Sequence, residues 1–140
     1  MADSKALVAA WFEAWNTGNV SLLDNVFDKN VVDNSAGQIP GLPKGIEGMR
    51  QSIQMYRAGF PDAHMRVDDT LVDGDKIVVR WTATGTNTGP MMGMPPTGKK
   101  VSVIGMGISR VAGGKIVESW GAFDQLGMLQ QLGIVPVMGG

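Results

Sequence analysis

The chain has 140 residues, which suits a single domain, and 44 % of them are hydrophobic, which allows a sizeable core. Its formal net charge of −1 comes without a basic run or an acidic tail, which argues against nucleic acid and anionic membrane as main partners. The absence of cysteine excludes disulfides, thiolate chemistry and cysteine zinc sites.

The N-terminus lacks a basic start followed by an apolar run, and no apolar stretch approaches the ~20 residues that span a bilayer. We therefore expect no signal peptide, no membrane partner and a cytoplasmic location. The chain has 10 methionines, which either fill the core or line a pocket.

The N-terminal segment predicts a helix over residues 3–17, because its apolar residues recur at helical spacing on one face. Asp3 or Ser4 can cap the start of this helix, and Gly18 can end it.

The next segment predicts short elements. Ser21 and Asp24 resemble a capping box that opens a short helix over residues 21–27. Val31–Val32 then predicts a short strand, and the prolines and glycines within 34–44 predict a loop.

Strands dominate the rest of the chain, where the apolar period changes from 3.6 to 2 after a second helix at 46–58. Four long strands are predicted, at 65–71, 77–83, 100–111 and 115–124. Tight turns at 73–75 and 112–114 join them in pairs. A last short helix is predicted at 125–132, followed by a tail at 134–140.

Alternation along the strands predicts which residues share a face. On the first strand these are Met65, Val67, Asp69 and Leu71. On the second they are Ile77, Val79, Trp81 and Ala83, with Val78, Arg80 and Thr82 opposite. On the last strand they are Ile116, Trp120, Ala122 and Asp124, with Glu118 in the same phase.

Helices followed by an antiparallel meander are typical of an α+β domain. Long strands twist and curl, and helices laid across the open side of a curled sheet enclose an interior. We therefore expect one domain over residues 1–140: a cone-shaped α+β barrel in which N-terminal helices close a pocket over a curved antiparallel sheet.

Six short motifs occur in order along the chain. They are Phe60-Pro61-Asp62, Asp73-Gly74-Asp75, residues 80–86 (RWTATGT), 94–99 (MPPTGK), 114–120 (GKIVESW), and Asp124 followed by 130–133 (QQLG). Together they resemble the SnoaL-like polyketide cyclase family, which has the nuclear-transport-factor-two-like fold. The resemblance runs from about residue 5 to 133.

This resemblance implies a small hydrophobic ligand in the pocket and no cofactor. Characterised family members close a ring of an anthracycline precursor by intramolecular aldol condensation of a polyketide methyl ester, with no metal. The fold also hosts isomerases, dehydratases and binding modules, so it does not decide the reaction.

The resemblance marks Asp124 as the catalytic acid/base, because the family has an aspartate four residues after the strand tryptophan, here Trp120. On an apolar inward face this carboxylate would lose hydration, which suits proton transfer near neutral pH. The alternative is that Asp124 caps the helix at 125–132.

Other polar residues have weaker claims. Glu118 shares the phase of Asp124 unless a bulge near Gly121 changes it, and a structural or solvated role is favoured. His64 is the only histidine and has solvated neighbours, so we expect it at the surface. Arg80 alternates with Trp81, which predicts an exposed or interface position.

Six residues are candidates for substrate binding, with core or turn roles as their alternatives. They are Trp15, Asn34, Tyr56, Trp81, Met92 and Trp120. Flat aromatic walls suit a planar polycyclic ligand, and an amide at Asn34 suits a carbonyl oxygen or an enolate. One histidine without cysteine provides no usual zinc site.

Two functions remain open: a cofactor-independent enzyme that acts on a small apolar carbonyl compound through enolate chemistry, and a binding module without turnover. The retained Asp124 favours the enzyme, whereas the absence of the histidines that the family often carries nearby favours the module. Apolar residues predicted on the outer face of the sheet, Val78, Val101, Val103 and Val117, indicate a homodimer.

Overall fold

The computed structural model describes residues 3–35, 39–91 and 93–137. Its elements follow the predicted order. They are α1 (Ser4–Thr17), the 3-10 helix η1 (Val20–Asn25), β1 (Phe27–Asp33), α2 (Ile46–Gly59), β2 (His64–Asp73), β3 (Lys76–Thr86), β4 (Lys100–Ala112), β5 (Lys115–Phe123) and α3 (Gln125–Gln131).

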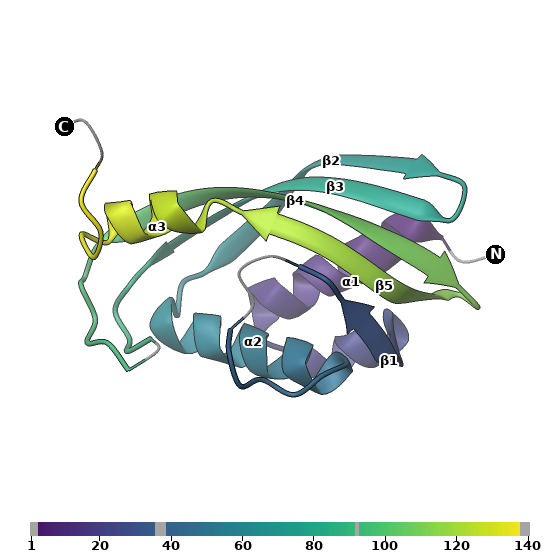
Figure 1. Cartoon of the computed structure of the whole chain (residues 1–140), viewed down its shortest axis with the longest axis horizontal. Coiled ribbons are helices and arrows are strands. Elements are labelled where there is room, and N and C mark those ends of the chain that lie inside the picture. Colours follow the sequence, from purple (N-terminus) through teal and green to yellow (C-terminus); the bar gives the residue numbers. More distant parts are fainter. Residues whose placement is uncertain (1–2, 36–38, 92, 138–140) are drawn as a thin grey trace.

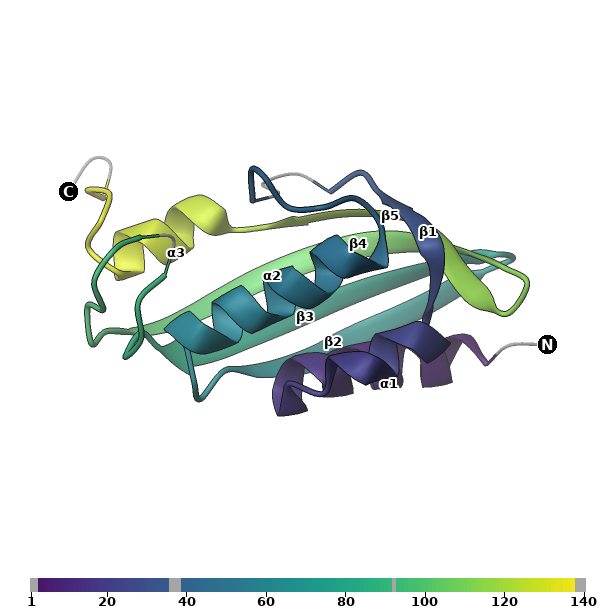
Figure 2. The same ribbon diagram turned by 90° about the horizontal axis from the view of Figure 1, so that it is seen from below.

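The five strands form one curved sheet in the order β1-β5-β4-β3-β2. Strands β2 to β5 are an antiparallel meander, and β1 pairs in parallel with β5. Helices α1 and α2 lie across one face of the sheet, and α3 lies at one end of it (Figures 1 and 2). This arrangement confirms the predicted α+β fold, whereas the parallel pairing of β1 was not predicted.

The ends of α1 are where the sequence predicts them. Asp3 Oδ1 accepts the backbone N–H of Lys5 at 3.0 Å, and Gly18 ends the helix with a left-handed φ of 78°. The predicted capping box is wrong, because the Ser21 hydroxyl donates instead to Asn19 Oδ1 and the segment forms a 3-10 helix.

A β-bulge in β5 changes which side chains face the helices. Val117 is an extra residue between the pair Ile116–Val111 and the pair Glu118–Arg110. Ile116 is buried on the inner face, but the even-numbered residues that follow point to the outer face. The predicted common face of Ile116, Trp120, Ala122 and Asp124 is therefore wrong.

A second bulge has the same effect in β2. Asp68 is an extra residue between the pairs that Val67 and Asp69 make with β3. Met65 and Val67 pack inward, whereas Asp69 and Leu71 are exposed, so these four residues do not share a face. In β3, by contrast, the predicted alternation holds.

The outer face of the sheet is apolar, although with other residues than predicted. Val101 and Val103 are buried on the inner face, which corrects their predicted outward position. The large side chains exposed on the outer face instead are Ile104, Met106, Ile108 and Trp120.

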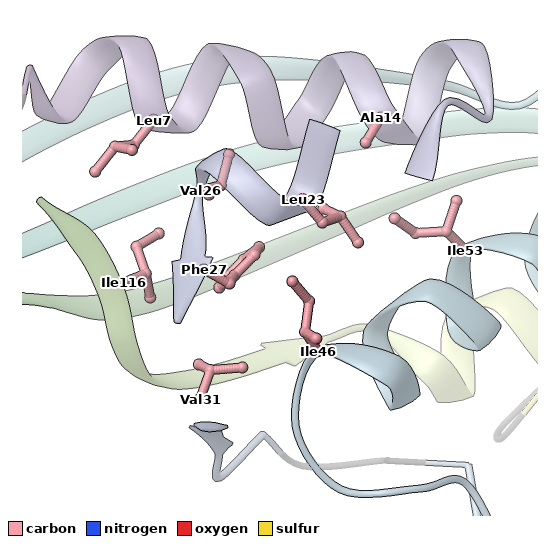
Figure 3. Close-up of a cluster of buried hydrophobic side chains, with 9 residues drawn as sticks. All are labelled: Leu7, Ala14, Leu23, Val26, Phe27, Val31, Ile46, Ile53 and Ile116. Carbon is pink, nitrogen blue, oxygen red and sulfur yellow. The ribbon is translucent and has the colours of Figure 1, made fainter. Parts of the chain in front are cut away.

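The largest group of buried side chains joins α1, η1, β1, α2 and β5 (Figure 3). Its fully buried members include Leu23, Phe27, Ile53 and Ile116. This core fixes α1 and α2 to the edge of the sheet formed by β1 and β5, and leaves the middle of the inner face to the site described below. Within the described ranges, no helix is long and apolar enough to cross a membrane.

Candidate functional site

A cavity of about 260 Å³ lies between the inner face of the sheet and helices α1 and α2. Apolar and aromatic side chains form most of its wall. From the helices these include Trp11, Phe12, Trp15, Met49 and Tyr56. From the strands they include Met65, Val79, Trp81, Val103 and Phe123.

Glycines on the inner face of the sheet make room for this cavity. Gly107 of β4 and Gly121 of β5 lie directly opposite each other in the ladder, and both line the cavity. Gly105 lies under the indole of Trp81, where a Cβ atom would come within 2.1 Å of Cζ2. Because Gly107 and Gly121 have no side chains, their backbone itself forms part of the wall.

Three of the predicted wall residues, Trp15, Tyr56 and Trp81, line the cavity together. Their rings form a line with Phe123. The ring centroids are 6.0 Å apart for Trp15 and Tyr56, 6.4 Å for Tyr56 and Phe123, and 6.3 Å for Phe123 and Trp81. Such a series of aromatic faces and edges suits a flat ligand.

Tyr56 adds a polar group to this wall. Burial raises the pKa of its phenol above the ordinary value of 10.0, since desolvation disfavours the phenolate. Its hydroxyl forms no hydrogen bond with another residue of the described ranges. The neutral hydroxyl is therefore a hydrogen-bond donor available to a ligand.

Asp124 does not line the cavity. It is exposed and caps α3, since its Oδ1 accepts the N–H of Gly127 at 2.9 Å. The bulge at Val117 is the reason, because it reverses the face on which Asp124 was predicted. The inward orientation is therefore wrong, and the catalytic role of Asp124 stays a prediction that its position does not support.

The other predicted binding residues lie elsewhere. Trp120 borders the cavity, with its backbone oxygen beside Gly107, but it lies on the outer face with 37 % of its surface exposed. Asn34 is exposed, and its Nδ2 donates to Glu118 Oε2 at 3.0 Å. Met92 lies outside the described residues.

Glu118, His64 and Arg80 take positions at the surface. Glu118 is partly buried and pairs with Arg110 at 3.2 Å. His64 is exposed at the start of β2. Arg80 is exposed and pairs with Asp69 at 2.6 Å, as alternation with Trp81 predicts.

The sequence did not single out a polar row on the inner face, formed by Asp33, Ser119 and Ser109. Asp33 of β1 is the register partner of Ser119 of β5, which is the register partner of Ser109 of β4. All three line the cavity, and the two serines are buried. Only the pairing of β1 with β5 and the bulge at Val117 bring them together, and neither can be read from alternation.

A second hollow, of about 580 Å³, adjoins the cavity between β1, α2 and residues 39–45. Both spaces are bordered by Trp15, Asp33 and Met49. Asp33 therefore lies where the two spaces meet. In the parts of the chain that are described, no three His, Cys, Asp or Glu side chains gather as a metal site would require.

The family model described as SnoaL-like polyketide cyclase matches residues 5–132. No curated protein sequence matches the chain.

Several solved structures are similar over nearly the whole chain. TsrD of Streptomyces laurentii is 30 % identical with a TM-score of 0.86, over 96 % of this chain and 100 % of that one. IdmH of Streptomyces antibioticus, a proposed polyketide cyclase, is 34 % identical with a TM-score of 0.80, over 92 % and 97 %. A proposed polyketide cyclase of Bacillus cereus is 31 % identical with a TM-score of 0.80, over 92 % and 79 %.

Proposed function

Because the chain belongs to the SnoaL-like polyketide cyclase family, we propose that it is a cofactor-independent, cyclase-like enzyme whose substrate is a small hydrophobic carbonyl compound. The observation that carries this proposal is the cavity between the sheet and the helices, with its line of aromatic rings. Largely apolar cavities with a few convergent polar groups are typical of small-molecule sites. Acid/base chemistry on a carbonyl compound fits the polar groups that border this cavity.

A binding module without turnover is the second candidate. The position of Asp124 favours the binding module. The family resemblance marks this carboxylate as the acid/base, but here it caps α3. A module would retain the same aromatic cavity and the same ligand class. The two candidates differ only in whether the bound compound reacts.

We further propose a homodimer formed through the outer face of the sheet. Ile104 and Met106 have 63 % and 60 % of their surface exposed, next to Ile108 and Trp120. Ion pairs flank this apolar centre, including the one between Arg110 and Glu118. An apolar centre with a polar rim is the usual composition of a protein interface.

Ligand binding can be tested with 2-acetylnaphthalene, a flat aryl methyl ketone, followed by quenching of tryptophan fluorescence. Trp11, Trp15 and Trp81 line the cavity and are not exposed, so a bound ring should quench their fluorescence. We expect saturable quenching and a rise in Tm. The absence of both up to the solubility limit of the ketone contradicts the proposed function.

A matched pair of variants locates the bound ketone. Gly107→Val places a side chain on the cavity wall, where it takes space from a bound ring, so the Kd should rise about tenfold or more, a loss of ~1.4 kcal/mol in binding free energy. Ala112→Val adds bulk to the same strand at an exposed position and should leave the Kd unchanged. Equal effects of the two variants would place the ketone outside the cavity.

A further inference from the structure

The polar row of the cavity wall has a composition that the family resemblance does not account for. Asp33 is the one acidic residue among the described residues that line the cavity. Beside it, two serine hydroxyls from neighbouring strands occupy an otherwise apolar wall. We propose that Asp33 is the acid/base of this site and that the Ser109–Ser119 pair is the donor that holds the ligand's carbonyl oxygen, an inference that rests on the proposed function.

Register places these groups within reach of one ligand. Asp33, Ser119 and Ser109 occupy consecutive strands at matching positions, and adjacent strands lie about 4.8 Å apart. In a carbonyl compound, the distance from the α-carbon to the carbonyl oxygen is shorter than this distance between strands. A ligand lying across β1 and β5 can therefore present its α-carbon to Asp33 and its oxygen to the serines.

The serine pair has one hydrogen to spare. The two Oγ atoms are 3.1 Å apart, and one hydroxyl donates to the other. Two hydroxyls have two hydrogens, so their mutual bond leaves one unused. Neither hydroxyl bonds to any further residue in the described ranges. Because a buried donor without an acceptor is unfavourable, the spare hydrogen favours a ligand oxygen at this point of the wall.

Ser109 and Ser119 line the cavity next to a pair of glycines. Ser109 and Ser119 are followed along the sheet by the glycine pair of Gly107 and Gly121, which has no side chains to cover them. Ser35, by contrast, lies over Gly121, with its Oγ 3.1 Å from the place of an added Cβ atom. A carbonyl group can thus reach the hydroxyls across Gly107, which Ser35 does not cover.

Hydrogen bonds from Ser35 orient the carboxylate of Asp33. The Ser35 backbone N–H donates to Asp33 Oδ1 at 3.0 Å, and the Ser35 hydroxyl donates to the same oxygen. A carboxylate has about four lone-pair sites on its two oxygens. These bonds hold the side chain at the junction of the cavity and the adjoining hollow.

The reaction that this arrangement supports begins with transfer of a proton from the ligand's α-carbon to Asp33. The C–H electron pair forms the carbon–carbon double bond of an enolate, and the negative oxygen accepts the spare serine hydrogen. The enolate carbon then attacks a second carbonyl carbon of the same ligand. A carbon–carbon bond forms, and the new alkoxide takes the proton back from Asp33. The product is an isomer of the ligand, so no oxidant or reductant is consumed.

The first of these steps can be measured without knowing the natural substrate. Enolisation of 2-acetylnaphthalene in D₂O exchanges its methyl protons for deuterium, and proton NMR follows the loss of signal. We expect the wild-type protein to accelerate this exchange above the rate in buffer. Asp33→Asn should lower the protein-dependent rate by about 10²-fold or more, because a general base typically contributes ~10²–10⁴-fold. The Kd of the ketone should stay within about threefold, since apolar walls supply most of its binding.

Two further variants separate chemistry from structure. Ser109→Ala combined with Ser119→Ala should lower the exchange rate by about 10²-fold, the effect of losing an oxyanion donor. Asp28→Asn is the matched control for Asp33→Asn. Asp28 lies on the same strand and accepts the N–H of the residue two positions later, as Asp33 does, but it does not line the cavity. The Asp28→Asn protein should exchange the methyl protons of the ketone at the wild-type rate. If Asp33→Asn fails to fold by circular dichroism, Asp33→Ser is the second variant, with the same expected loss.

The outcomes distinguish this inference from the proposed function. A ketone that does not bind overturns both. A ketone that binds without protein-dependent exchange overturns the assignment of Asp33 and the serines, and leaves the binding function standing. An Asp33→Asn protein that exchanges at the wild-type rate, or a loss seen in Asp124→Asn instead, also overturns the assignment.

Discussion

Tyr56 can be observed directly, because it is the only tyrosine in the chain. Burial raises the pKa of its phenol above 10.0. A spectrophotometric titration of the tyrosinate absorbance should therefore have a midpoint above 10 in the folded protein. In denaturant the midpoint should return to the ordinary value, about 10. A folded midpoint at or below 10 would show that the hydroxyl is not desolvated.

The same residue predicts a dependence of stability on alkaline pH. The folded pKa is raised above the unfolded one, so the stabilisation is fully present below about pH 10, where both states are protonated. As pH rises from there towards the folded pKa, the unfolded state ionises first and stability falls. Tyr56→Phe removes the ionisation and should flatten this part of the urea unfolding profile. An equally steep alkaline decline in the variant would assign it to other groups.

Residue type and spacing were sufficient to predict the cavity walls at Trp15, Tyr56 and Trp81, because these aromatic side chains share a face with other apolar residues of their helix or strand. The polar residues were not predictable in this way. Asp124 was assigned inward by counting along β5, and one extra residue at Val117 reverses that count. The sequence does not identify Asp33 as a cavity residue. A carboxylate at the end of a short strand is expected at the surface, and only the parallel pairing of β1 with β5 places it beside Ser119.

At the scale of the elements, Asn87 joins the end of α2 to the connection between β3 and β4. Its side-chain Nδ2 donates to the carbonyls of Gly59 and Gly89, and its Oδ1 accepts the N–H and the hydroxyl of Thr97. Only 3 % of the residue is exposed. Asn87→Ala leaves these groups without partners, and we expect a loss of about 2–4 kcal/mol in the free energy of unfolding.

Urea denaturation measures this loss, with Asn34→Ala as the control. Asn34 is exposed and its side chain makes a single hydrogen bond, to Glu118, so its removal should cost less than about 1 kcal/mol. If Asn87→Ala lowers the free energy of unfolding as little as Asn34→Ala does, water replaces the hydrogen bonds of the Asn87 side chain. The connection would then hold its position by its apolar contacts alone.

Element types and order followed from period and turn residues, whereas strand phase did not. The turn glycines and the change of period from 3.6 to 2 are local features, so the sequence displays them. A bulge depends on the register in which two strands pair. Both bulges, at Val117 and Asp68, lie in strands whose sequence alternates regularly. The parallel pairing of β1 is a contact between segments about 90 residues apart, which no local pattern records.

At the scale of the whole molecule, the outer face of the sheet predicts self-association. A two-fold dimer through this face brings each copy's apolar centre against its own equivalent, so one charged substitution appears twice in the interface. Ile104→Glu combined with Ile108→Glu places four carboxylates in the buried centre, where unpaired charges are costly. Val137→Glu adds a carboxylate at a residue that is as exposed as Ile104 but lies outside the strands, after α3.

Sedimentation equilibrium over the micromolar range distinguishes these proteins by mass. The wild type and Val137→Glu should have the mass of two 14.9 kDa chains, and the Ile104→Glu/Ile108→Glu protein the mass of one. The cavity lies on the opposite face of the sheet, so this variant should still bind 2-acetylnaphthalene with a Kd near that of the wild type. A wild type that stays monomeric at high concentration contradicts the dimer. Loss of ketone binding in the monomeric variant would instead show that the cavity depends on the partner copy supporting the sheet from outside.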